Sequence, residues 1–177
     1  MERLQMSIVK NQMTLAEIEA LAKQDRYDEA LDECGKLIEL FPCDLDLIRM
    51  RAYVFARSGD YNSALRDRKK ILAKDGTQLK DYYLTANNAL EIRDFRQASD
   101  LLDKLLSLGR EQNEFWFESA AFFLQAYALM ELEEYNNALI CLEKALNVDP
   151  NCSLPLPGIG FCTANQLRNE IESRILD

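Results

Sequence analysis

A four-residue pattern, an aromatic residue followed three positions later by alanine, recurs four times in this chain and constrains its fold more than any other feature. The copies begin at Tyr27, Tyr61, Phe95 and Tyr135, so their alanines are 34, 34 and 40 residues apart. Such a period is typical of a repeat protein, in which stacked helical or stranded units bury one continuous core. The longer third interval carries six extra residues, Asn113 to Glu118.

Residues 119–151 show what one unit contains, because two amphipathic helices are expected there around a tight acidic turn, Glu133-Glu134. Apolar residues fall on one face of each predicted helix: Phe122, Ala126 and Leu129 on the first, Ala138, Leu142 and Ala145 on the second. Ala126 and Ala138 are small, so the two helices can approach closely there. Pro150 ends the unit, since proline cannot donate to a continuing helix.

This order of large and small residues, followed by Y-x-x-A, leucine, alanine and proline, resembles the tetratricopeptide repeat (TPR) family over about residues 11–151. The resemblance implies an all-α fold, an α-solenoid of about four helix pairs with a C-terminal capping helix, in a single domain spanning residues 1–177. We expect the repeats at about residues 11–44, 45–78, 79–112 and 113–152. The C-terminal loop and cap helix then occupy residues 153–177.

The N-terminal residues leave two possibilities open. Glu2 to Met13 is expected to be helical, and Thr14 with Glu17 forms a capping-box pattern that starts a new helix at Leu15. The alternative is one long helix from Glu2 to Lys23.

The six-residue insertion is expected to lengthen the helix that follows it. Asn113 is a good residue for the position that precedes a helix, because its side chain can accept from the first backbone amides. The pattern therefore predicts a helix from about Glu114 to Leu132.

The segment Ser153 to Cys162 contains two prolines and two glycines and is not expected to be helical. Its apolar residues Leu154, Leu156, Ile159 and Phe161 are expected to fold back over the last repeat, which has no neighbour to cover it. Thr163 and Gln166 form a second capping-box pattern and predict a final helix to about Ile175.

The charge argues against general nucleic-acid binding, which needs a basic surface. The net charge is −9 and the isoelectric point is near 4.7, so the partner is expected to be a protein, and an acidic chain suits a basic one. No apolar run is long enough to cross a membrane, and the N-terminus lacks the apolar core of a secretory signal. Five cysteines without CxxC spacing are then expected to be reduced thiols in a cytoplasmic protein.

The residue types for catalysis and metal binding are sparse. The chain has no histidine, the commonest general base. The cysteine spacings match no zinc pattern, and acidic pairs fall in predicted turns and helix starts, where carboxylates are expected for structural reasons. The sequence therefore predicts a protein that is not an enzyme and that has no cofactor and no metal site.

A basic cluster, Arg66-Asp67-Arg68-Lys69-Lys70, lies on the second helix of the second repeat. We expect it to be a solvated outer face. A weaker alternative joins it with Arg49 and Arg57 in a patch that binds nucleic acid, in which case binding should fall steeply with salt.

In the TPR family the first helices of successive repeats line a concave groove, and this geometry implies a candidate partner-binding site. The positions that match are Arg49, Tyr53 and Arg57 in the second repeat, Lys80, Tyr83 and Asn87 in the third, and Phe123, Tyr127 and Met130 in the fourth, with Trp116 of the insertion extending the last set. Tyrosine, tryptophan and arginine are frequent binding hot spots. The alternative is that the C-terminal segment buries Trp116, Phe123 and Tyr127.

Some family members hold the C-terminal carboxylate of heat-shock proteins with a clamp of lysine, asparagine and arginine. The matching positions here are Arg49, Tyr53, Leu84, Ala120 and Leu124, and only Arg49 is of the right type, so this function is excluded.

Two functions remain. The first is a dedicated binder that occupies one protein, as a toxin-neutralising immunity protein (antitoxin) or a secretion chaperone does. The second is a generic adaptor or assembly scaffold that recognises short peptides. The acidic, stand-alone chain favours the first.

Overall fold

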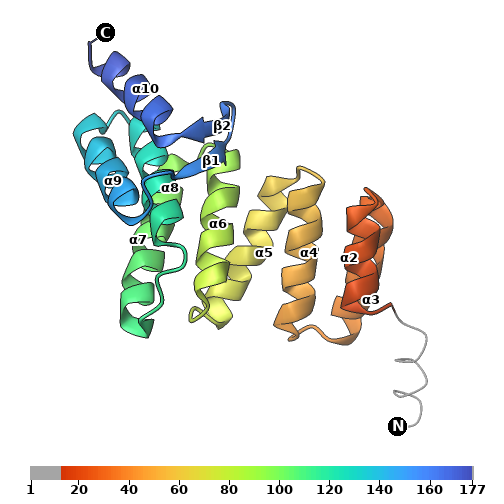
Figure 1. Cartoon of the computed structure of the whole chain (residues 1–177). Helices are drawn as coiled ribbons and strands as arrows, with labels where there is room; N and C mark the ends of the chain where they lie inside the picture. The colour runs from red at the N-terminus through yellow and green to blue at the C-terminus, as the bar shows by residue number, and fades with distance from the viewer. Residues whose placement is uncertain (1–12, 177) are drawn as a thin grey trace. The chain divides into compact units, whose positions relative to one another are not determined.

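The computed structural model describes residues 13–176, which form nine helices and one β-hairpin (Figure 1). Residue contacts divide the chain into two compact units, residues 1–74 (unit 1) and 75–177 (unit 2), and each is described by itself. The all-α prediction is confirmed: helices follow one another in TPR-like pairs, and a further helix ends the chain. The prediction of a single domain stays a prediction.

Unit 1 contains two helix pairs. These are α2 (Leu15–Lys23) with α3 (Tyr27–Leu40) and α4 (Leu45–Arg57) with α5 (Tyr61–Lys74). Helix α3 packs against α2 and α4, and α4 packs against α5. The core between them is formed by Ile18, Leu21, Ala22, Ala30, Cys34, Leu37, Leu47 and Val54.

The start of α2 confirms the predicted capping box. The hydroxyl of Thr14 accepts from the amide of Glu17 at 3.3 Å, and the Glu17 carboxylate accepts from the amide of Thr14 at 2.7 Å. Thr14 has extended backbone angles, with ψ at 161°. One continuous helix from Glu2 to Lys23 is therefore excluded, whereas the helix expected before Met13 lies outside the described residues.

Unit 2 contains two further helix pairs and the C-terminal segment. Its elements are α6 (Leu79–Glu91), α7 (Phe95–Gln112), α8 (Glu118–Glu131), α9 (Tyr135–Val148), β1 (Ser153–Leu156), β2 (Gly160–Thr163) and α10 (Ala164–Leu176). Helix α8 packs against α7, α9 and β1, while α10 packs against α9 and β2 (Figure 1). Ten of the 14 residues of α8 are buried, so α8 is the centre of this unit.

The repeated alanines are fully buried, as their small size at a close helix contact predicts. Ala30, Ala64, Ala98 and Ala138 each have 0% of their surface exposed, so each helix pair meets at its alanine. Five residues before each of them, the turn of the pair has a residue in the left-handed conformation: Asp25, Gly59, Arg93 and Glu133, with φ between 61° and 84°. The turn is therefore repeated with the same conformation although its sequence differs.

The six-residue insertion does not lengthen the helix that follows it, so the prediction of a helix from Glu114 to Leu132 is wrong at its start. Helix α7 has 18 residues, against 14 in α5 and α9, and ends at Gln112; Asn113 is left-handed (φ 57°) and is its C-cap rather than an N-cap. A turn follows, and α8 starts at Glu118. Phe117, 2% exposed, fixes this turn because it packs onto Gly109, where a Cβ atom would lie 2.2 Å from the Phe117 ring.

The C-terminal segment forms an antiparallel hairpin, in which Leu154 pairs with Cys162 and Pro155 with Phe161. Strand alternation turns Leu156 and Cys162 inward, at 3% and 4% exposure, as the sequence predicted for Leu156. It turns Phe161 outward at 70%, and Ile159 at the turn is 47% exposed, so these two residues do not cover the last repeat. The capping box of Thr163 and Gln166 is confirmed at the start of α10.

Candidate functional site

In unit 1, the candidate groove residues lie along α4 at spacings of four. Arg49 is paired with Asp46 at 2.9 Å, and Arg57 lies 3.7 Å from the carboxylate of Asp25. Tyr53 is half-buried and packs against the core of this unit. The structure thus places all three side chains on one helix face. The Arg57 side chain, 44% exposed, is more accessible than that of Arg49, 21% exposed.

In unit 2, the candidate groove residues of α6 are Lys80, Tyr83 and Asn87, and Tyr83 forms an aromatic contact. The ring of Tyr83 meets the indole of Trp116 edge-on, with centroids 6.4 Å apart. Asn87 donates through its side chain to the carbonyl of Tyr83 at 2.9 Å, and Lys80 is exposed one turn earlier. Burial raises the pKa of the Tyr83 hydroxyl, so this tyrosine stays neutral in the physiological range.

Trp116 lies in the turn between α7 and α8 and is 63% exposed. Its indole N–H donates to the Glu114 carboxylate at 3.3 Å, and its ring meets Phe117 edge-on at 5.3 Å. Phe115, beside it in the chain, is 47% exposed. Tyr83, Phe115 and Trp116 are called the aromatic surface below. The prediction that Trp116 continues a helical row of residues is wrong, since no helix covers residues 114–117.

The other candidate residues of unit 2 lie in its interior. Phe123 and Met130 are 0% exposed and Tyr127 is 3% exposed, so they do not line an open surface. The Tyr127 hydroxyl donates to the carbonyl of Pro157, between the two strands, at 2.8 Å. Burial, with a smaller contribution from Glu131, raises the pKa of Tyr127 to about 12. The alternative prediction, burial by the C-terminal segment, therefore describes Tyr127. It does not describe Trp116, which stays exposed.

The basic cluster on α5 is not one solvated face. Asp67 and Arg68 are each 3% exposed, whereas Arg66, Lys69 and Lys70 are exposed. Asp67 accepts two hydrogen bonds from the Arg51 guanidinium, at 2.6 and 2.9 Å. The helix therefore turns the middle of the cluster into the protein and its flanks toward solvent, and this pair raises the pKa of Arg51.

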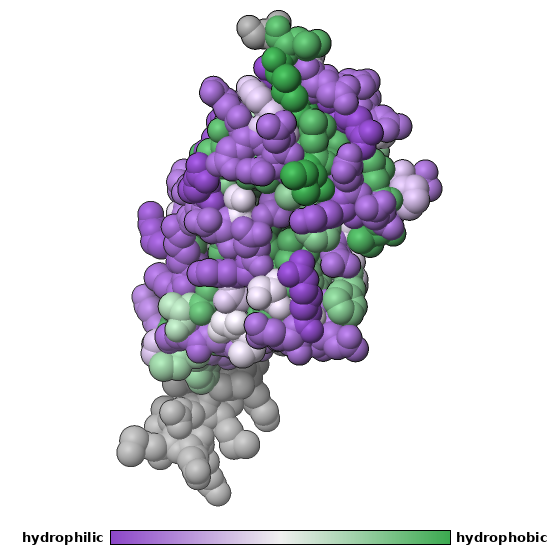
Figure 2. Space-filling model, turned by 90° about the vertical axis from the view of Figure 1, so that its left-hand side faces the viewer, coloured by the Kyte–Doolittle hydropathy of each residue, from purple (hydrophilic) through white to green (hydrophobic). Residues whose placement is uncertain are grey.

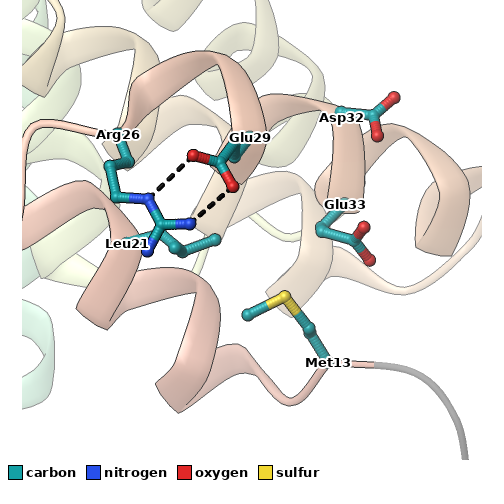
Figure 3. A pocket seen from close by; sticks show the side chains of 6 residues that line it. All are labelled: Met13, Leu21, Arg26, Glu29, Asp32 and Glu33. Atoms are coloured by element: carbon teal, nitrogen blue, oxygen red, sulfur yellow. Dashed lines mark hydrogen bonds and ion pairs between the residues drawn. The ribbon is translucent and has the colours of Figure 1, made fainter.

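A hollow of about 320 Å³ opens beside α2 and α3 in unit 1 (Figure 3). It is lined by Met13, Leu21, Arg26, Glu29, Asp32 and Glu33. Arg26 and Glu29 point toward each other across it and form two hydrogen bonds, at 2.6 and 2.7 Å. Asp32 and Glu33 each pair with Lys36 at 2.7 Å. The hollow thus combines an apolar floor with charges that are neutralised within the chain.

Sequence reasoning missed two exposed apolar groups of unit 2. The outward side of the hairpin presents Phe161, which a two-residue alternation in Ser153–Cys162 could have revealed. Figure 2 shows hydrophobic residues reaching the surface on the side where α9 and α10 lie. The exposed apolar residues of these helices are Ile140, Val148, Ile175 and Leu176.

Residues that could perform chemistry are dispersed. Within residues 13–176, no group of three or more cysteine, aspartate or glutamate side chains could hold a metal ion. Burial raises the pKa of the Cys34 thiol to about 11, and it also raises the pKa of Cys141, Cys152 and Cys162, which weakens them as nucleophiles. No described helix has the length and apolar character needed to span a membrane. The absence of a cofactor and the cytoplasmic location stay predictions.

The comparisons with known proteins agree with this architecture. Residues 119–152 match the family model of the tetratricopeptide repeat. Among solved structures, MamA from Desulfovibrio magneticus RS-1 is 18% identical, with 76% of this chain and 73% of that chain covered and a TM-score of 0.67. A MamA structure designated MSR-1 is 15% identical, covers 90% of this chain and 83% of that chain, and has a TM-score of 0.70. The resemblance to the TPR family is thus confirmed for residues 119–152, and the solved structures show the same kind of fold over most of the chain.

Proposed function

We propose that this chain is a non-catalytic TPR protein that occupies one dedicated protein partner, as a toxin-neutralising immunity protein or a secretion chaperone does. The observation that carries the proposal is the aromatic surface of unit 2. A protein that acts by binding needs an exposed surface that a partner can cover, and the aromatic surface provides one. The described residues offer no assembled catalytic group that would favour an enzyme instead.

The aromatic surface has the composition of a binding hot spot. Trp116 exposes 63% of its surface, although tryptophan is normally well buried, and edge contacts with Tyr83 and Phe117 hold its ring in place. A rigid exposed indole loses little conformational freedom when a partner covers it. Tyrosine and tryptophan are enriched at the centres of protein interfaces.

The charge of unit 2 favours a partner with a basic surface. Unit 2 contains 17 Asp and Glu residues against 8 Lys and Arg, a net charge of −9, whereas unit 1 contains 13 of each and is neutral. The net negative charge of the chain therefore lies entirely in the unit that bears the aromatic surface. Such a field accelerates the approach of a basic partner and disfavours acidic ones.

The proposal is tested by capturing partners from a native lysate with the wild type and with Tyr83→Ala/Trp116→Ala. We expect one stoichiometric protein, whose affinity for the double variant falls by about 30-fold or more, as the loss of a hot spot implies. Phe161→Ala is the matched control, since Phe161 is an equally exposed aromatic residue of the same unit, and its affinity should change less than about twofold.

Helical circular dichroism of each variant shows whether the fold is retained. The same protein bound equally well by the double variant would contradict the aromatic surface as the binding site. Several weakly bound proteins would favour the generic adaptor instead.

A further inference from the structure

Helix α5 exposes four cations on its outer side: Arg66, Lys69, Lys70 and Lys74. They are called the cationic stripe. Residues 66, 70 and 74 lie on successive turns of one helix face, and residue 69 lies beside residues 66 and 70. At 1.5 Å per residue the stripe is about 12 Å long.

The acidic residue inside this sequence is shared between Lys70 of the stripe and Arg51 of α4. Asp67 is turned into unit 1, where both of its oxygens accept from Arg51. It also lies 3.2 Å from the Lys70 ammonium, but its own side chain is only 4% exposed. Among the described residues, Lys70 is the member of the stripe that forms an ion pair, and Arg66 contributes to lowering the pKa of the Asp60 carboxyl.

The fold does not require this arrangement. Like charges three and four residues apart destabilise a helix, and here they stand at 66/69, 66/70 and 70/74. The helix pair α4–α5, residues 45–74, carries 8 Lys and Arg against 3 Asp and Glu, whereas residues 13–44 carry 3 against 9. A concentration of exposed cations on one helix of an acidic protein points to a ligand that carries negative charge.

We propose that the cationic stripe binds a short acidic segment, rich in aspartate and glutamate, of the protein partner. This inference rests on the proposed function, which it extends to a second contact of opposite sign. Contacts of both signs fix the register of a complex and reject partners that carry only one of them.

A protein segment fits the stripe better than nucleic acid does. Without these four cations, the remaining residues of the chain have a net charge of −13, since the whole chain has −9. Double-stranded DNA carries a negative charge for about every 1.7 Å of its axis, so it would extend beyond a stripe about 12 Å long onto an acidic protein. An acidic peptide can confine its charge to the length of the stripe.

The test titrates ¹⁵N-labelled protein with octaglutamate in low salt and follows the backbone amide signals. We expect shifts concentrated on α5, and a dissociation constant that weakens by about tenfold when Arg66, Lys69, Lys70 and Lys74 are all changed to Gln. The matched control changes Lys23, Lys36, Lys104 and Arg110 to Gln, four exposed cations on other helices, which alters the net charge equally. Its affinity for octaglutamate should fall less than about threefold.

The proposal is overturned if octaglutamate shifts no α5 signals, or if both quadruple variants lose affinity equally, because the net charge alone would then explain binding. A single-stranded DNA of eight nucleotides that bound the stripe more tightly than octaglutamate would assign it to nucleic acid. These outcomes are independent of the Tyr83/Trp116 variants, so this inference can fail while the proposed function stands.

Discussion

The cysteines show how environment, at the scale of one residue, separates identical side chains. Cys34, Cys141, Cys152 and Cys162 are buried, and Cys43, between α3 and α4, is exposed. The sequence predicted that all five are free thiols, which the structure matches, and the absence of CxxC spacing was the signal. Which of them is accessible could not be predicted, because Cys152 and Cys162 are buried by a hairpin that the sequence pattern did not reveal.

We expect Ellman's reagent at pH 8 to titrate one thiol rapidly in the native protein and five in denaturant. The thiolate is the reacting species, and burial both shields Cys34 and raises its pKa to about 11. Cys43→Ser should remove the fast phase and leave the total at four. Two or more thiols reacting at the fast rate would contradict the burial of the others.

At the scale of an element, the turn between α7 and α8 shows where local patterns mislead. Asparagine is favoured both before a helix and in the left-handed position after one, so Asn113 alone is ambiguous. The outcome depends on Phe117, which packs against Gly109 eight residues earlier and holds the chain in a turn. Such a contact cannot be read from propensities, and for this reason Trp116 was expected on a helix and lies in the turn instead.

The two helical glycines provide a direct test of this contact. At Gly109 a Cβ atom would lie 2.2 Å from the Phe117 ring and 2.8 Å from the Glu114 carbonyl oxygen, so Gly109→Ala should lower the free energy of unfolding by about 1–3 kcal/mol. At Gly35 in α3 nothing lies within 4 Å, and Gly35→Ala should be neutral or stabilise by up to about 1 kcal/mol. Urea unfolding measures both, and similar effects of the two substitutions would refute the contact.

At the scale of the whole molecule, the helix pairs were predictable because each depends on contacts within one period, between residues such as Ala126 and Ala138. The candidate site was less predictable. Lys80 and Trp116 are exposed and Tyr83 is half-buried, whereas Phe123, Tyr127 and Met130 are interior. The burial of Tyr127 depends in part on the C-terminal hairpin, where the Pro157 carbonyl accepts from its hydroxyl although 30 residues separate them in the chain.

Hydrogen exchange should therefore differ strongly between helices. Helix α8, with ten of 14 residues buried, should exchange most slowly, and α2, with three of nine, should open at lower free energy. Mass spectrometry of peptides covering residues 15–23 and 118–131 measures both. Equal protection of the two would contradict this order and would indicate that the chain unfolds only as a whole.

The left-handed turns have a consequence for how this protein can change over time. Asp25, Arg93 and Glu133 adopt a conformation that costs a residue with a side chain about 1 kcal/mol, whereas Gly59 adopts it at no such cost. Packing on both sides of each turn thus imposes the conformation against local preference. Single substitutions at these three positions could recover part of that free energy without altering a buried residue. The free energy of unfolding gained at these turns could offset destabilising changes at the binding surfaces. A lineage of such proteins could therefore exchange one partner for another while keeping its fold.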